Sequence, residues 1–257
     1  MLDLTEDHQQ PLYFCNKPGV RIFQQVRPKG GAGAPVTARL LQLGHRGVAF
    51  FSVEMAKDYA RDRWTGISKV YKAAGCGHAV RRFSVGAHNE HEGDHQMYDY
   101  SHLALKFIAE QVPLQSGTPR EHLVRHLVET AQDSLVLSYY RWQIAREMEP
   151  LCRQALNDRS ITAWVCSDDY ESLAVLSFLT RNGIHVPGEI SLVGFNNCAE
   201  ALENNLTSYS SNIEMAFGLM LDHVARPEWS RNRRAVKPFT FQGSLIERGT
   251  TGPGPFC

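Results

Sequence analysis

Two groups of small polar residues could bind a hydroxyl-rich ligand in this chain of 257 residues. Ser167, Asp168 and Asp169 follow one apolar run, and Asn196 and Asn197 follow the next one. Carboxylate oxygens accept hydrogen bonds strongly from hydroxyl groups, whereas the amide of asparagine both accepts and donates. Because Asp168 and Asp169 are adjacent in sequence, their side chains should diverge rather than share a proton, and we expect no catalytic pair here.

The residues between the two groups predict a strand–helix–strand unit that brings the groups together. Residues 161–166 and 190–195 are short apolar runs, as in strands that are buried on both faces. The apolar stripe between them predicts a helix, which we expect Asp169 to cap and Asn182-Gly183 to end. Such a crossover makes the strands parallel, and open parallel sheets bind ligands beyond the carboxyl ends of their strands. Both groups should therefore lie at that edge.

The rest of the chain alternates between predicted strands and helices, which indicates an α/β fold. Strands are expected at 11–15, 48–52, 80–85 and 238–242, and helices are expected before Gly44, at 61–74 and at 213–225. Residues 102–156 predict several helices, with a break at Pro150 because proline lacks the amide hydrogen that a helix interior needs. The tail after Gly252 is expected to be loose.

The composition is that of an ordinary soluble globular protein. Hydrophobic residues make up 43% and charged residues 21%, and 27 basic residues balance 27 acidic ones, so no overall positive field attracts nucleic acid. No apolar run approaches the roughly 20 residues that span a membrane, and the start lacks the features of a signal peptide. The six cysteines form no CxxC pair, which favours a reducing cytoplasm. Since no nucleophile elbow or cofactor motif occurs, we expect neither an enzyme nor a cofactor.

One motif favours a different class of protein. His91-Glu92-Gly93-Asp94-His95 matches HExxH, in which two histidines one helical turn apart bind zinc and the glutamate acts as general base. However, Gly93 and Asp94 are poor residues for a helix interior, and the flanks carry no amphipathic stripe. His91 and His95 are therefore weak metal candidates, and a zinc hydrolase is the least favoured hypothesis.

Five segments occur in an order that carries a family resemblance. They are Leu-Leu-Gln-Leu-Gly-His-Arg-Gly-Val-Ala-Phe at 40–50, Arg-Asp-Arg-Trp-Thr-Gly-Ile at 61–67, the unit at 161–197 with Asn-Gly-Ile-His-Val-Pro-Gly-Glu-Ile-Ser and Val-Gly-Phe-Asn-Asn, Leu-Thr-Ser at 206–208, and Gly-Ser-Leu-Ile-Glu-Arg-Gly-Thr-Thr at 243–251. In these segments the chain resembles the effector-binding domain of LacI/GalR-type transcriptional regulators.

The resemblance implies an N-terminally truncated, parallel-sheet fold of the periplasmic-binding-protein-like type I, spanning residues 11–251. Residues 31–205 plus 236–257 would form a nearly complete C-terminal lobe, and residues 11–30 plus 207–235 would form part of an N-terminal lobe. Residues 86–155 exceed the usual connection in the family and imply an atypical helical insertion. Because no helix-turn-helix precedes residue 11, we expect no DNA-binding headpiece in this chain.

The same resemblance implies seven ligand-binding candidates. They are Arg63, Asp168, Asn196, Asn16, Trp64, Tyr170 and Ser211. The guanidinium of Arg63 would offer a rigid fork of donors to sugar hydroxyls, and the two aromatic rings could stack on an apolar sugar face. Core packing or plain solvent exposure is the alternative role for each residue.

The function implied by the resemblance is ligand sensing. A small-molecule effector, a sugar or its phosphate or acid derivative, would bind between two lobes of a cytoplasmic homodimer. Binding would shift the lobes and change DNA affinity through a separate headpiece. The alternative is a stand-alone or decayed sugar-binding module without DNA output. No membrane partner is expected.

Overall fold

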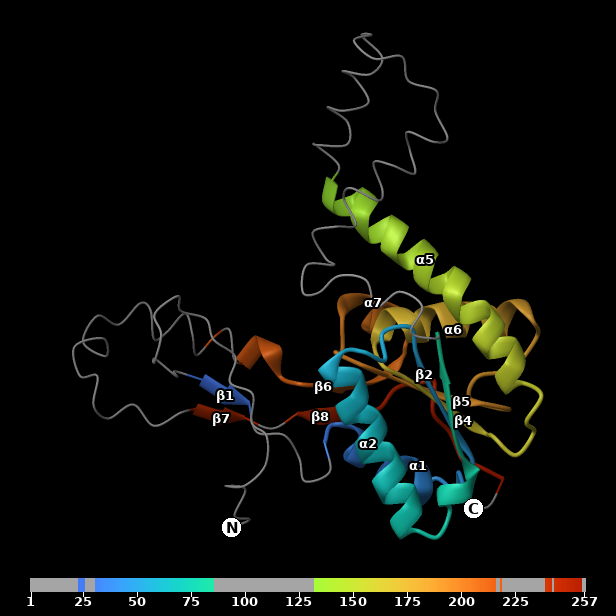
Figure 1. Ribbon diagram of the computed structural model, residues 1–257. Helices are drawn as coiled ribbons and strands as arrows, with labels where there is room; N and C mark the ends of the chain where they lie inside the picture. The colour runs from blue at the N-terminus through green and yellow to red at the C-terminus, as the bar shows by residue number, and fades with distance from the viewer. Residues whose placement is uncertain are drawn as a thin grey trace.

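The computed structural model describes residues 23–25, 31–85, 132–215, 218, 239–241 and 243–255. Its main body is a six-stranded sheet in the order β3-β2-β4-β5-β6-β8 (Figure 1). In that order, the strands are Val80–Ser84, Val48–Ser52, Ala163–Cys166, Ser191–Phe195, Thr207–Ser210 and Ser244–Ile246. Neighbouring strands are parallel except for β6 and β8. The expected parallel-sheet α/β fold is confirmed.

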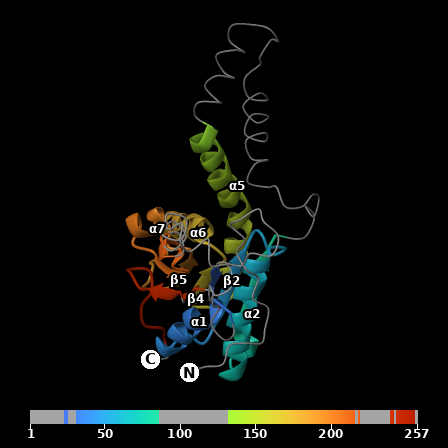
Figure 2. The ribbon, with the colours of Figure 1, turned by 90° about the vertical axis from the view of Figure 1, so that its left-hand side faces the viewer.

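Helices cover both faces of this sheet (Figures 1 and 2). They are α1 (Gly33–Gln42), α2 (Asp58–Ala73), α5 (Gln132–Ala155) and α6 (Asp169–Arg181), together with the short α7 (Ala199–Glu203) and the 3-10 helix η1 (Gly77–Ala79). Side chains alternate along β2: Val48 and Phe50 pack with α1 and α2, whereas Ala49 and Phe51 pack with α5 and α6. Both faces are thus hydrophobic cores, which explains why the strands read as continuous apolar runs.

Helix α5 corrects the expected break at Pro150, because the helix runs through this residue without interruption. A proline inside a helix costs about 3 kcal/mol or more, since a hydrogen bond is lost. Ile144, Met148, Cys152 and Ala155 form a fully buried stripe on both sides of Pro150. Each large apolar side chain contributes about 1.5–3 kcal/mol on burial, so packing outweighs the local penalty. Among the described residues, no helix is both long and apolar enough to cross a lipid bilayer.

Two strand pairings bear on the expected division into lobes. Residues 207–235 were expected in the N-terminal lobe. The first four of them form strand β6, which pairs with β5 and β8 inside the six-stranded sheet. Strand β7 (Phe239–Phe241), expected in the C-lobe, instead pairs in parallel with β1 (Phe23–Gln25) as a separate two-stranded sheet. The chain therefore leaves the six-stranded sheet after Ser210 and rejoins it at Ser244. Of the helix expected at 213–225, residues 213–215 and 218 are described and are helical.

The C-terminal tail is tied down rather than loose as far as the described residues extend. The Gly252 carbonyl lies 3.0 Å from Nε2 of the buried His45, and the Gly252 amide donates to Ser191 Oγ at 3.0 Å. The Gly254 amide donates to the Leu43 carbonyl at 2.5 Å. A Cβ on Gly254 would approach the Gly44 backbone to 2.8 Å, so this contact depends on glycine. The tail thereby closes the end of the sheet opposite the two polar groups.

Candidate ligand-binding site

The two polar groups of the sequence meet at the carboxyl edge of the sheet, as predicted. Ser167 follows β4 directly, its amide donates to the Phe51 carbonyl at 2.9 Å, and its hydroxyl lies 2.9 Å from Ser52 Oγ. Asn196 follows β5, and its amide donates to the Tyr209 carbonyl at 2.9 Å. Hydrogen bonds thus join the ends of β2 and β4 and the ends of β5 and β6.

Arg63 of α2 bridges the two groups. Its Nη1 donates to the Ser167 carbonyl, and its Nη2 donates to Asn196 Oδ1 at 3.0 Å. The guanidinium lies between two rings, 4.9 Å from the centroid of Tyr59 and 4.5 Å from that of Phe195. The guanidinium of Arg63 was expected to donate hydrogen bonds to a ligand. The structure shows that both terminal nitrogens already donate to protein oxygens.

Asp168 is the N-cap of α6, a role that the sequence suggested for Asp169. Its Oδ1 accepts from the Glu171 amide at 2.8 Å, which satisfies one of the orphan donors of the helix start. The residue is only 6% exposed. Burial raises the pKa of Asp168 to about 6, although the Glu171 amide and the charge of Arg63 oppose this shift. A buried carboxylate at this edge is an acceptor for hydroxyl or ammonium groups.

Asp169, which follows β4, does not cap the helix but accepts hydrogen bonds from β6 and from the loop after β5. Its carboxylate accepts from the Cys198 amide at 2.9 Å and from Ser208 Oγ at 2.7 Å. This approach requires Gly194 in β5, because a Cβ there would lie 2.2 Å from Asp169 Oδ1. Burial raises the pKa of Asp169, and the two donors counteract the rise. Asp169 therefore positions the loop after β5.

Glu171 is a site residue that the sequence interpretation missed. It is fully buried and accepts three hydrogen bonds, from the Val53 amide at 2.7 Å, the Ser167 amide at 2.8 Å and Ser167 Oγ at 2.7 Å. Burial and the nearby charge of Asp168 raise its pKa to about 8. The signal was present, because Asp168 and Glu171 have the three-residue spacing of a capping box. In this variant the glutamate reaches back to Ser167 and across to β2.

The loop after β5 is held in an unusual backbone conformation. Asn196 and Asn197 have φ angles of 105° and 54°, in a region where asparagine is favoured over other non-glycine residues. Arg248, which sequence reasoning also missed, donates to Asn197 Oδ1 at 2.6 Å and to the Leu206 carbonyl at 2.7 Å. Asn196 is exposed, so its amide group reaches solvent at the edge.

Two of the other candidates, Tyr170 and Trp64, contact aromatic side chains of the protein. The ring of Tyr170 packs against Tyr140 with centroids 6.0 Å apart and lies under Arg141 at 5.1 Å, at the contact with α5. Trp64 packs against Phe50 at 5.8 Å and lines a separate hollow of about 500 Å³ next to β3. Both rings therefore make packing contacts within the protein. Ser211 follows β6 and is partly exposed. Asn16 and the HExxH motif at 91–95 lie outside the described residues.

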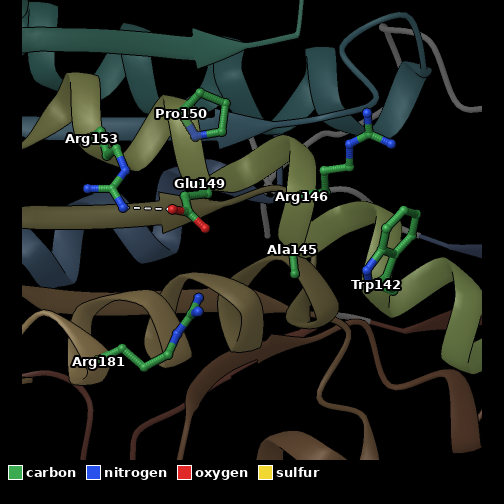
Figure 3. A pocket seen from close by; sticks show the side chains of 7 residues that line it. All are labelled: Trp142, Ala145, Arg146, Glu149, Pro150, Arg153 and Arg181. Atoms are coloured by element: carbon green, nitrogen blue, oxygen red, sulfur yellow. Dashed lines mark hydrogen bonds and ion pairs between the residues drawn. The ribbon is translucent and has the colours of Figure 1, made fainter.

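We use "carboxyl-edge site" for Arg63, Asp168 and Asn196. A second hollow, of about 520 Å³, lies between α5 and the end of α6. Its lining contains Trp142, Arg146, Glu149, Arg153 and Arg181, and we call it the arginine groove (Figure 3). Its side chains are exposed, and Arg153 pairs with Glu149 at 2.7 Å.

Comparisons with known proteins agree with this fold. The family model of the periplasmic binding protein-like domain matches residues 37–251. An HTH-type transcriptional regulator of Mycolicibacterium smegmatis (strain ATCC 700084 / mc(2)155) is 24% identical over 247 residues, which cover 91% of this chain and 52% of that protein. The chain thus spans about half the length of this relative.

Solved structures share the fold at low sequence identity. A transcription regulator from Lactobacillus plantarum is 15% identical with a TM-score of 0.54, covering 89% of this chain and 67% of that one. A LacI family transcriptional regulator from Enterococcus faecium, with bound ribose, is also 15% identical with a TM-score of 0.51, covering 86% of this chain and 62% of that one.

Proposed function

The chain belongs to the periplasmic binding protein-like family, and we propose that it is the effector-binding part of a LacI-type transcriptional regulator. One observation carries this proposal: Arg63, Asp168 and Asn196 gather at the carboxyl edge of a parallel sheet. Ligands of open α/β sheets bind at that edge. The described part of the site consists of binding groups, and we propose a binding rather than a catalytic role.

The proposed effector is a small sugar-like molecule. Asp168 supplies a buried acceptor, and the exposed amide of Asn196 both donates and accepts, a pairing that suits vicinal hydroxyl groups. The Enterococcus faecium relative that binds ribose is consistent with this class of ligand. The ligand would lie between the six-stranded lobe and a second lobe, to which β1 and β7 would belong.

The regulatory output is a proposal for the whole protein. Effector binding would favour one arrangement of the lobes, and a homodimer would transmit the shift to a DNA-binding headpiece. We propose a cytoplasmic location, since DNA is the final partner. The likeness to an HTH-type transcriptional regulator over 91% of this chain supports this output.

Thermal unfolding with a panel of pentoses and hexoses tests the binding proposal. A ligand at 100 times its Kd adds about 2.7 kcal/mol to the unfolding free energy, which raises Tm by several degrees. We expect at least one sugar to do so, and we expect Asp168→Ala combined with Asn196→Ala to abolish the shift. Asn204→Ala, at the exposed end of α7, is the matched control and should keep it.

Two outcomes would change the proposal. If no sugar raises Tm in the unsubstituted chain, the carboxyl-edge site is not a sugar site. If a sugar binds but leaves operator binding by the intact protein unchanged, the chain is a sugar-binding module without DNA output.

A further inference from the structure

The charge balance of the carboxyl-edge site restricts its ligand further. Arg63 is a cation within the site, but its two terminal nitrogens donate to Ser167 and Asn196. The rings of Tyr59 and Phe195 cover the guanidinium at 4.9 and 4.5 Å. A phosphate or carboxylate is bound best by a guanidinium that presents two parallel N–H donors. Each terminal nitrogen thus already donates one hydrogen bond to the protein, and two rings lie against the guanidinium, so fewer of its donors remain for an anionic ligand.

Carboxylates, by contrast, are in excess around Arg63. Asp168, Asp169 and Glu171 are all buried, and Glu54 accepts from the Tyr59 hydroxyl next to them. In the described part of the chain, no arginine, lysine or histidine lies within ion-pair distance of the three buried carboxylates. The charge of Arg63 opposes the rise in the pKa of Asp168, but within the described residues none of the three has the direct ion-pair partner that buried charges normally have.

Asp168 is the member of this set that a ligand can reach. Asp169 and Glu171 use their carboxylates on backbone amides and serine hydroxyls of the protein itself. Asp168 uses Oδ1 for the cap of α6, and no described residue donates to its Oδ2. With 6% exposure it retains contact with the edge. Its raised pKa of about 6 still leaves it mostly ionised at neutral pH.

We propose that the carboxyl-edge site selects an amino sugar, whose ammonium group pairs with the Asp168 carboxylate while its hydroxyl groups bond to Asn196. This selectivity rests on the proposed sugar-binding function and narrows it. The ammonium would supply the cation that Asp168 lacks. A sugar phosphate or uronic acid would meet like charge at Asp168, beside a guanidinium that already donates to two protein oxygens. The expected order of affinity is amino sugar, then neutral sugar, then phosphorylated or acidic sugar.

Matched trios of ligands test this order by isothermal titration calorimetry at pH 7. Each trio contains a hexosamine, the corresponding hexose and the hexose 6-phosphate, in the gluco, galacto and manno series. A charge-assisted hydrogen bond contributes more than a neutral one, and we expect about a ten-fold preference for the hexosamine over the hexose in the series that binds best. The 6-phosphate should bind more weakly than the hexose.

Asp168→Asn tests the effect of the negative charge, because the side chain keeps its size and shape. Asparagine keeps an oxygen that can cap α6, so folding should survive, but the negative charge is lost. We expect the variant to lose the preference for the hexosamine over the hexose, and its affinity for the 6-phosphate relative to the hexose should rise above that of the unsubstituted chain. Asp58→Asn is the control, because it removes one exposed negative charge from the start of α2. It should keep the original order.

The outcomes separate selectivity from function. Equal or tighter binding of the hexose or the 6-phosphate overturns the amino-sugar inference but leaves a sugar site. The same holds if Asp168→Asn retains the hexosamine preference. If no member of any trio binds, the sugar-binding function fails, and the selectivity fails with it.

Discussion

The carboxyl-edge site and the arginine groove hold their charged side chains in opposite ways. At the edge, Asp168 and Glu171 are 6% and 0% exposed, and backbone amides from β2, β4 and α6 donate to them. In the groove, the side chains of Arg153 and Glu149 are 62% and 40% exposed, and they pair across one turn of the same helix (Figure 3). The first is a network between elements, whereas the second is a local surface pair.

This difference in burial determines how strongly a charged side chain affects the stability of the fold. When a hydrogen bond between a buried carboxylate and its donor is broken, both groups are left unsatisfied in a medium of low dielectric constant. When an exposed ion pair is broken, water replaces the lost hydrogen bonds. The attraction within such a pair is also screened by salt. Substitutions of the same chemical kind should therefore differ strongly between the two regions. Helix α6 connects them, since Asp168 caps its start and its last residue, Arg181, lines the groove.

The largest effect is expected from Glu171→Ala. The substitution removes the acceptor of the Val53 amide, and it removes one of two hydrogen-bond partners from both the amide and the hydroxyl of the buried Ser167. We expect the free energy of unfolding to fall by about 3 kcal/mol, since three hydrogen bonds to a fully buried side chain are lost together and a cavity is left. Urea denaturation followed by circular dichroism measures this change.

Glu149→Ala in the arginine groove is the control for that experiment, because it also replaces a glutamate by alanine. It removes an exposed carboxylate from a pair on α5, and the denaturation midpoint should not change measurably. Similar losses of stability in the two variants would show that burial does not distinguish the two regions. A Glu171→Ala protein with unchanged stability would show that water replaces the carboxylate without loss.

Much of this architecture was predictable because it depends on local signals. Apolar runs bounded by turn residues located β2, β4 and β5, and Asn182-Gly183 located the end of α6. The parallel crossover then placed the polar groups at one edge. Glu171 could have been found as well, because its spacing from Asp168 is that of a capping box.

The remainder depends on contacts between residues that are distant in sequence. Arg63 donates to residues 104 and 133 positions away, so no local pattern shows that both of its terminal nitrogens are used. Helix α5 continues through Pro150 because its buried stripe packs on the sheet, a gain that the local propensity of proline does not include. The position of β6 in the sheet likewise follows from pairing with β8, which lies more than 30 residues further along.

A smaller effect is expected from pH at the carboxyl edge. The pKa of Glu171 is raised from 4.5 to about 8 and that of Asp168 from 3.8 to about 6, so the folded state holds protons more tightly than the unfolded chain. This contribution to stability is fully present below about pH 4 and is lost as pH rises through 6 to 8. Glu171→Gln removes the higher of the two steps.

Urea denaturation at pH 5 and pH 8.5 measures the pH effect as a difference between proteins. The decrease in stability between these values should be larger in the unsubstituted chain than in Glu171→Gln by on the order of 1–2 kcal/mol. Glu149→Gln in the groove should leave the decrease unchanged. If Glu171→Gln has the same pH profile as the unsubstituted chain, the Glu171 carboxyl group does not take up the proton on folding.

The smallest effect is expected from Arg153→Gln, which removes the groove's ion pair and the contact of the guanidinium with the Phe178 ring. Because the side chain is 62% exposed, we expect neither the denaturation midpoint nor the sugar-induced rise in Tm to change measurably. The same assays apply, with 0.5 M sodium chloride as a second condition, since salt already screens this pair. A reduced sugar response with unchanged stability would contradict the independence of the two regions. It would mean that α6, which spans both, transmits a change at its end to the cap formed by Asp168.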